Sequence, residues 1–229
     1  MRLGDAVWTD IEPLTRSSEV AQPILVIPIG SCEQHGPHLP LDTDTRIASA
    51  IADRLAERLS HVLVAPAIGI SASGEHAGFP GTLSLGTTVT EALLIELVRS
   101  ADWCRGGVVL VNGHGGNAVA GRAATATLTA EGRRVLNWWP HVAGADAHAG
   151  RTETSLMMSI APQLVRGDAM APGNTTPLAE LFGTLSSAGV AAASANGVLG
   201  DPTGASAAEG AVILDGLVAD LVQRVEAWS

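Results

Sequence analysis

The sequence is poor in cysteine and in basic residues. Its 229 residues include only two cysteines, Cys32 and Cys104, which cannot form a disulfide framework. Lysine and arginine together number 13, against 23 aspartates and glutamates, and the largest basic cluster is the pair Arg133-Arg134. Because a nucleic-acid-binding protein needs a basic face, this balance argues against nucleic acids and anionic membranes as partners.

Long apolar runs are also missing. A membrane-spanning helix needs about 20 consecutive apolar residues, and no run in the chain approaches that length. The first residues, Met1 to Asp5, lack the basic region and apolar segment of a signal peptide. We therefore expect a soluble, cytoplasmic protein.

The sequence does contain an ordinary apolar fraction of 46%, with no linker, low-complexity block or fixed-period repeat. We predict one domain over residues 1–229. Strands are expected at 23–29, 61–66, 107–112 and 134–139, and helices at 45–60, 88–104, 118–131 and 206–228. Strands that alternate with helices predict an α/β fold, with a mainly parallel sheet and helices on both faces.

Capping boxes are expected to open two of these helices, at Thr88–Glu91 and at Ser206–Glu209. Residues 161–200 are too weakly patterned for a prediction. In the adjacent tryptophan pair, we expect one of Trp138 and Trp139 in the core and the other at a substrate pocket.

Polar side chains follow three of the expected strands. Glu33, His35 and Asp44 follow the first, His114 lies in a glycine-rich turn after the third, and Glu153 follows the fourth. Because the carboxyl ends of parallel strands meet at one edge of a sheet, we expect these side chains to converge. The long loop 68–87, with Glu75 and His76, is expected at the rim of the same site.

Carboxylates and imidazoles without thiolates suit a Zn, Mn or Fe ion better than a structural zinc site. Three carboxylates among five candidate ligands exceed what one divalent ion needs, so two ions sharing a bridging carboxylate is the economical interpretation. Such a pair polarises a carbonyl and lowers the pKa of bound water, as hydrolysis requires. A further His or Glu must then move a proton to the leaving nitrogen.

Each candidate also has a purely structural interpretation. Glu33 and His35 could form a salt-bridged loop, and Asp44 could cap the following helix. His114 could belong to an anion-binding turn, and Glu153 could complement a helix dipole. One site explains these residues more economically than four coincidences at one sheet edge.

Four motifs resemble a known family. Residues 31–44 (SCEQHGPHLPLDTD) closely resemble the N-terminal signature of the creatininase (creatinine amidohydrolase) family. Residues 112–117 (NGHGGN) and 148–155 (HAGRTETS) are similar to its second and third motifs, and 197–202 (GVLGDP) to its C-terminal pattern. The resemblance runs from about residue 8 to 228. It implies a doubly wound α/β subunit with a dinuclear metal centre that hydrolyses C–N bonds.

The resemblance also implies a ligand set and cofactors. By position, the metal ligands are Glu33, His35, Asp44, His114 and Glu153. Asp44 would bridge two divalent ions per subunit, Fe²⁺ and/or Zn²⁺ with Mn²⁺ possible, and His148 would transfer the proton, with Glu153 also at the catalytic centre. Asp42 matches a position that is not a ligand. Close relatives are homo-oligomers, so a hexamer or octamer is expected.

One departure bears on the substrate. Creatininase itself carries Tyr-Glu after its Gly-His, and that Glu is a metal ligand, whereas this chain has Gly115-Gly116. Glu153 is therefore the expected replacement, and creatinine is not the expected substrate. The short chain, its start at 4–8 (GDAVW) and residues 138–140 (WWP) are most similar to a family member that trims a C-terminal Val-Tyr dipeptide from a ribosomally made, modified precursor peptide.

Two other functions stay open at this point. One is an amidohydrolase acting on a small cyclic amide such as creatinine, or on a related formamide. The other is a metal-dependent binding or scaffold protein without turnover. A peptide tail needs an open groove and a ring needs a closed pocket. The cations nearest in sequence to the ligand motifs are Arg46 and Arg151.

Overall fold

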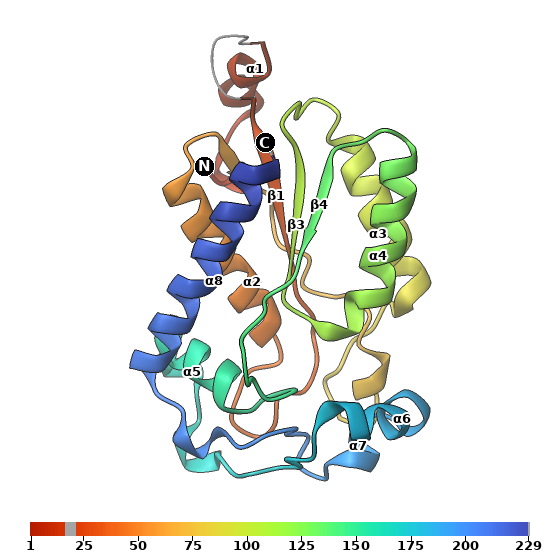
Figure 1. Ribbon diagram of the computed structural model, residues 1–229, viewed down its shortest axis with the longest axis vertical. Coiled ribbons are helices and arrows are strands. Elements are labelled where there is room, and N and C mark those ends of the chain that lie inside the picture. The colour runs from red at the N-terminus through yellow and green to blue at the C-terminus, as the bar shows by residue number, and fades with distance from the viewer. Residues whose placement is uncertain (17–21, 229) are drawn as a thin grey trace.

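Four parallel strands form the centre of the protein (Figure 1). The computed structural model describes residues 1–16 and 22–228. The strands are β1 (Ile24–Ile29), β2 (Val62–Val64), β3 (Gly107–Asn112) and β4 (Val135–Trp138), in the order β2-β1-β3-β4. All three pairings are parallel. The predicted α/β class with a mainly parallel sheet is confirmed.

The central strands are buried on both faces. Every residue of β1 and β3 is buried, as expected for apolar runs without polar alternation. Ile24 and Val26 of β1 pack into one core cluster, and Leu25 and Ile27 into another. This alternation follows from the two-residue period of a strand, and it requires helices on each side.

Helices cover both faces, as predicted (Figure 1). One face carries α2 (Thr43–Arg58), α5 (Arg151–Ile160) and α8 (Ala207–Trp228), and the other carries α3 (Gly86–Ser100) and α4 (Ala118–Ala130). Beyond the carboxyl ends of the strands lie α6 (Leu178–Ala188) and α7 (Val190–Ala193), whereas α1 (Trp8–Arg16) lies at the opposite end. Within the described residues, no helix has the length and apolar character needed to cross a membrane.

Of the two predicted capping boxes, the first is not formed and the second is half formed. Thr88 and Glu91 do not open α3, because the helix already begins at Gly86, whose N–H donates to Ser84 Oγ at 3.1 Å. At α8, Ser206 Oγ accepts the Glu209 N–H at 3.2 Å as expected. The Glu209 carboxylate instead accepts a hydrogen bond from Arg151 at 2.9 Å, so the reciprocal half of that box is missing.

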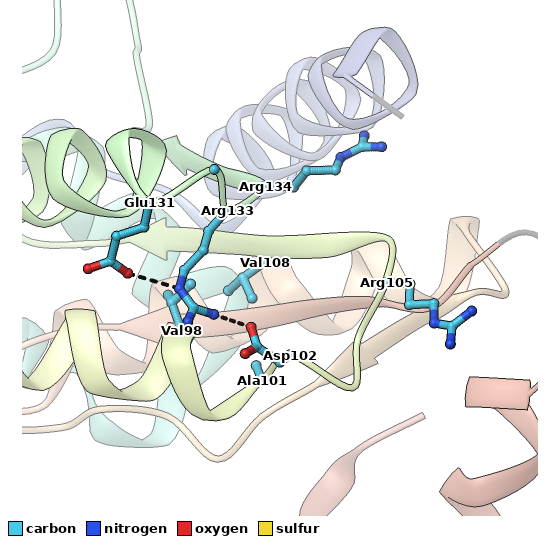
Figure 2. Close-up of a pocket in the computed structure, with 9 residues that line it drawn as sticks. Val98, Ala101, Asp102, Arg105, Val108, Glu131, Arg133 and Arg134 are labelled. Carbon is cyan, nitrogen blue, oxygen red and sulfur yellow. Dashed lines mark hydrogen bonds and ion pairs between the residues drawn. The ribbon is translucent and has the colours of Figure 1, made fainter.

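A cavity bordered by ion-paired side chains lies at the amino ends of the strands (Figure 2). A cavity of about 360 Å³ lies there between α3, β3 and the turn after α4. Arg133 pairs with Asp102 and with Glu131, whose carboxylate also pairs with Arg99. Arg105, which is exposed, also lines this cavity. We call this region the amino-end pocket.

Candidate metal centre

Each of the four strands is followed by a loop that brings titratable side chains to the carboxyl end of the sheet. These side chains are Glu33 and His35 after β1, His76 after β2, His114 after β3 and His148 after β4. The order β2-β1-β3-β4 changes direction between β1 and β3, and ligands of open α/β sheets bind at such a switch point. The first turns of α2 and α5 add Asp44 and Glu153.

We call the assembled group the carboxyl-end cluster: Glu33, His35, Asp44, His76, His114, His148 and Glu153. All seven are buried except Glu153, which is partly buried. The structure therefore brings together every ligand expected from the sequence and the expected proton-transfer residue.

Asp44 lies between two histidines of the cluster. Its Oδ1 is 3.0 Å from His35 Nε2, and its Oδ2 is 3.2 Å from His114 Nδ1. Ser31 Oγ donates a hydrogen bond to Oδ2 at 2.7 Å and so fixes the carboxylate. Each oxygen of this carboxylate therefore faces a different imidazole.

The remaining carboxylates divide between the two sides of Asp44. On one side, Glu33 Oε2 is 3.1 Å from His114 Nε2, and on the other, Glu153 Oε2 is 3.9 Å from His35 Nε2. One ligand atom each from Glu33, His35 and Asp44 lie within 4.8 Å of one another. These three residues are therefore close enough to hold a metal ion.

Glu33 tests whether the residues fit a cation. Its side chain is 0% exposed, yet neither carboxylate oxygen has a hydrogen-bond partner. An ionised carboxylate buried without compensation costs on the order of several kcal/mol. In the metal-free protein the protonated His114, 3.1 Å away, supplies part of that compensation, and a divalent cation would supply it in its place. The mixed oxygen and nitrogen donors suit zinc, manganese or iron. The residues therefore fit a divalent metal ion.

Gln34 orients two histidines of the cluster. Its Oε1 accepts the Gly36 N–H at 2.8 Å and its Nε2 donates to the Gly197 carbonyl at 2.9 Å, which fixes the amide. The second N–H lies between His76 Nδ1 at 2.9 Å and His148 Nε2 at 3.0 Å. The Gln34 main-chain carbonyl also contacts His148 Nε2, which therefore carries its own hydrogen. The second N–H of the Gln34 amide is therefore donated to His76 Nδ1.

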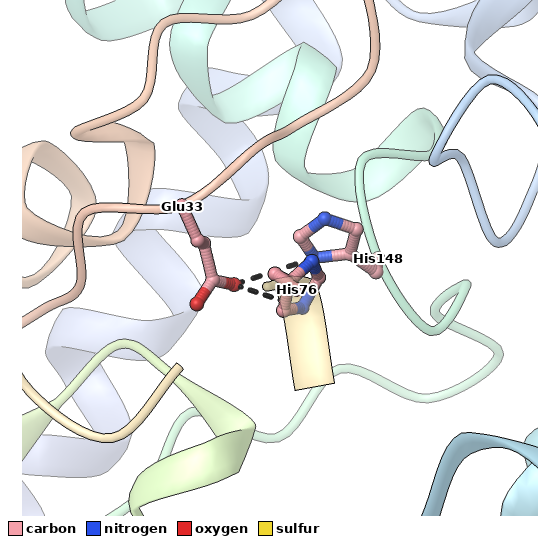
Figure 3. Close-up of side chains that lie close together, drawn as sticks. All are labelled: Glu33, His76 and His148. Atoms are coloured by element: carbon pink, nitrogen blue, oxygen red, sulfur yellow. Dashed lines mark ion pairs between the residues drawn. The ribbon is translucent and has the colours of Figure 1, made fainter. Parts of the chain in front are cut away.

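His148 turns one ring nitrogen towards the carboxylates (Figure 3). Its Nε2 lies 2.8 Å from the Gln34 main-chain oxygen, which can only accept, so Nε2 carries the hydrogen. Nδ1 then faces Glu33 Oε1 at 3.8 Å. The main chain of His148 pairs with Leu199 in both directions, at 2.8 and 3.2 Å, which anchors the loop after β4.

Burial sets the protonation of the two residues expected to act on protons. Burial, together with the neighbouring His35 and His76, holds the pKa of His148 well below its usual range. The imidazole is therefore neutral near pH 7 and can accept a proton. Burial, aided by the charge of Asp44, raises the pKa of Glu153 to about 7.

Opposite shifts occur at the histidines beside Asp44. Burial favours neutral imidazole, but Asp44 and neighbouring carboxylates outweigh it and raise the pKa of His35 to about 9. The pKa of His114 is raised well above its usual value, again against burial, by Glu33 and Asp44. In the metal-free protein, protons on these rings balance the carboxylates.

A strained residue separates His148 from Glu153. Ala149 has φ of 52°, in the left-handed region that non-glycine residues rarely adopt. Its N–H donates to Glu153 Oε2 at 2.6 Å and holds that carboxylate towards the cluster. Backbone strain of this kind concentrates at functional sites.

Gly116 lies too close to its neighbours for any side chain. A Cβ at this position would lie 2.3 Å from both His114 Nε2 and Glu75 Oε1, so no side chain fits. The loop after β3 therefore cannot supply a carboxylate from this position. In this chain Glu153, from α5, reaches the cluster instead.

The sequence placed His76 only at the rim of the site and did not predict Gln34. His76 is 3% exposed, with its Nε2 3.3 Å from Glu33 Oε1, so it lies inside the cluster rather than at its rim. Gln34 was not predicted. The available signal for His76 was its place in the loop after β2, equivalent to those of the other three loops. Glu75 does lie near the rim, 3.4 Å from His114 Nε2.

Other expectations meet mixed outcomes. Trp138 is in the core as expected, but Trp139 packs near Gly121 of α4 and does not line the pocket beside the cluster. Arg46 pairs with Asp42 and Arg151 with Glu209, at 2.7 and 2.9 Å.

A large cavity opens beside the cluster. Its volume is about 790 Å³, and it lies between α4, α6, α7 and the loop after β2. Asp44, His114, His148 and Glu153 line it. We call this cavity the carboxyl-end pocket.

Comparison with known proteins identifies the family. The family model described as creatininase, creatinine amidohydrolase, matches residues 5–225. A Mycolicibacterium smegmatis protein named mycofactocin precursor peptide peptidase is 51% identical over 212 residues, covering 90% of this chain and 85% of its own. The Mycobacterium tuberculosis H37Rv protein of that name is 50% identical, covering 90% and 86%. A Pseudomonas putida creatinine amidohydrolase is 30% identical, covering 81% and 86%.

Solved structures agree with these matches. Creatininase in a manganese form has the same fold, with a TM-score of 0.82 at 24% identity over 99% of this chain and 97% of that one. A mutant creatininase of zinc–zinc type has a TM-score of 0.81 at 25% identity, with the same coverage. The predicted resemblance is confirmed, and the chain belongs to the creatininase family of hydrolases, which act on C–N bonds.

Proposed function

We propose that this chain is a metal-dependent peptidase that cleaves an amide bond near the C-terminus of a ribosomally made precursor peptide. The released fragment is a Val-Tyr dipeptide, and the reaction belongs to mycofactocin biosynthesis. The named relatives, about half identical over nine-tenths of the chain, support this substrate. The carboxyl-end pocket, which is large and has exposed walls, is the observation that carries the proposal.

The proposed cofactors are two divalent ions, zinc, iron(II) or manganese. Glu33, Asp44 and His114 would hold one ion. His35, Asp44 and Glu153 would hold the other. When bound, these ions supply Lewis-acid chemistry, which polarises the scissile carbonyl and activates water for attack.

His148 moves the proton in the proposed reaction. Its Nδ1 faces the cluster, and the lowered pKa keeps the ring neutral, so Nδ1 has an unprotonated lone pair for a proton from the attacking water. The same nitrogen then donates that proton to the leaving amine. Gln34 supports this role, because it holds the His148 Nε2–H and so leaves Nδ1 available.

The alternative substrate is a small cyclic amide, which is suggested by the 30% identical creatinine amidohydrolase. Two features favour the peptide. The pocket of about 790 Å³ is bordered by exposed side chains of α4 and α6 rather than closed around a ring. The loop after β3 also lacks the creatininase carboxylate, since Gly116 leaves no space for it.

The same proposal covers the organisation of the protein. We expect one metallohydrolase domain spanning residues 1–229, a cytoplasmic location and a homo-oligomeric assembly, a hexamer or octamer. Size-exclusion chromatography with light scattering measures the subunit number.

Mass spectrometry of parallel incubations tests the proposed activity. The protein is reconstituted separately with zinc, manganese and iron(II), then mixed with the modified precursor peptide or with creatinine. Loss of a C-terminal Val-Tyr dipeptide is expected, and the matched Glu33→Gln variant should not release it. Ring opening of creatinine without peptide cleavage would contradict the peptidase and establish the alternative.

A further inference from the structure

One arginine of the carboxyl-end pocket has no carboxylate partner. Arg122 lines this pocket from α4, and no other arginine of the described residues lines it. Within residues 1–16 and 22–228, no ion pair includes Arg122. Its side chain is exposed, so an incoming anion can reach the guanidinium. By contrast, Arg46 and Arg151 already pair with carboxylates.

The acidic residues around Arg122 restrict where an anionic ligand can bind in the pocket. The other charged groups that line the pocket include the carboxylates of Asp44, Glu75 and Glu153. An anionic ligand is repelled by these groups wherever no cation balances them. A guanidinium binds a carboxylate through two parallel hydrogen bonds, which gives orientation as well as affinity. The terminal carboxylate of a peptide therefore has one suitable partner among the pocket's side chains.

Apolar side chains border the same space. Leu178, Phe182 and Leu185 are spaced four and three residues apart, so they share one face of α6, and all three line the pocket. Phe182 is 66% exposed, and Val119 on α4 is 58% exposed. Exposed apolar residues beside a buried polar cluster are typical of a ligand site. This border suits the apolar or aromatic side chains of a short peptide.

The rise along α4 from its first residue to Arg122 is comparable with the length of a dipeptide. Ala118 begins α4 just after the His114 loop, and Arg122 is four residues later, a rise of about 6 Å along the helix. An extended two-residue segment reaches about 7 Å. Arg122 therefore lines the same pocket as the cluster, about one helical turn further along α4, a length comparable with that of a dipeptide.

We propose that Arg122 binds the C-terminal carboxylate of the peptide substrate, while α6 and Val119 contact the side chains of the dipeptide to be released. This inference rests on the proposed peptidase function, which it deepens. It assigns the preferred substrate class as peptides with a free C-terminal carboxylate and apolar or aromatic terminal residues.

Calorimetry with the product tests this site without turnover. The probes are the Val-Tyr dipeptide and its C-terminal amide, titrated into metal-loaded protein. We expect the free acid to bind at least about tenfold more tightly than the amide, because a charge-assisted bidentate contact is lost in the amide. Arg122→Gln should abolish this preference, and Arg122→Lys should keep part of it.

Two further variants separate charge from apolar contact. Arg105→Gln removes the same charge from an exposed arginine at the amino-end pocket and should leave both affinities unchanged (Figure 2). Phe182→Ala should weaken binding of the free-acid dipeptide and of its amide by the same factor. An Arg122→Gln variant that still prefers the acid, or a wild-type protein without preference, would overturn the inference.

Cleavage of the precursor peptide and its C-terminally amidated form separates this inference from the proposed function. Faster cleavage of the free acid supports both. Equal cleavage of both peptides refutes the Arg122 site and retains the peptidase. Acid-dependent dipeptide binding without cleavage of either peptide retains the Arg122 site and refutes the peptidase. Neither binding nor cleavage refutes both.

Discussion

The two ends of the sheet contain similar charged residues in opposite environments. At the carboxyl end, Glu33 and Asp44 are 0% and 2% exposed and face imidazoles. At the amino end, Glu131 and Arg133 form ion pairs that water reaches (Figure 2). Exposed pairs contribute little to stability, whereas buried charges are expensive unless other charges compensate them. The buried group therefore indicates a functional site, and the exposed one does not.

Removing a ligand at the carboxyl end should have the largest effect. Glu33→Gln and His114→Ala are each expected to lose bound metal and to lower kcat/KM by more than about 100-fold, since outer-shell changes alone cost 10- to 100-fold. Elemental analysis and peptide cleavage measure the two effects. Glu131→Gln at the amino end is the matched control and should change neither. Full metal content in both ligand variants would remove these residues from the ligand set.

Replacing His148 should separate proton transfer from metal binding. His148→Ala is expected to lower kcat by about 100-fold or more, the usual scale for a general acid–base group. Its metal content should equal that of the wild type, because the five proposed ligands remain. An unchanged kcat would show that another group moves the proton.

Metal uptake should release protons from the carboxyl-end cluster. The raised pKa of His35, about 9, keeps this ring protonated at pH 7 in the metal-free protein, and His114 is shifted in the same direction. Because a ligand must be deprotonated, metal affinity should increase as pH rises from 6 towards 9. Calorimetry in buffers of different ionisation enthalpy measures the released protons. Uptake without proton release would contradict these shifts.

The smallest effect is expected at the amino end. Arg133→Gln breaks the pairs with Asp102 and Glu131, both on the surface. Thermal unfolding should show little or no change in Tm, and kcat/KM should be unaffected. A loss of activity comparable to that of the ligand variants would erase the distinction between the two ends.

Strong local patterns made the sheet and part of the site predictable from the sequence. β1 and β3 are continuous apolar runs, so their burial, and the parallel sheet that buries them, could be inferred. The convergence of the loops was then expected from the common direction of the strands. Glu33, His114 and Glu153, which follow strands of one direction, were therefore expected to lie near one another.

Other features depend on tertiary contacts that no local pattern records. His76 lies in a long loop whose path is fixed by contacts such as the one between Gln34 Nε2 and His76 Nδ1. Residues 161–200 are weakly patterned because α6 exposes Leu178 and Phe182 to the pocket instead of burying a regular apolar face. The start of α3 at Gly86 depends on Ser84, outside the predicted capping box.

Anomalous diffraction from crystals of the metal-loaded protein tests the central claim most directly. Data collected at the absorption edge of the loaded metal should show two peaks, one on each side of Asp44. One peak should lie beside Glu33 and His114, and the other beside His35 and Glu153. A single peak, or peaks away from Asp44, would contradict a dinuclear centre at the carboxyl end of the sheet.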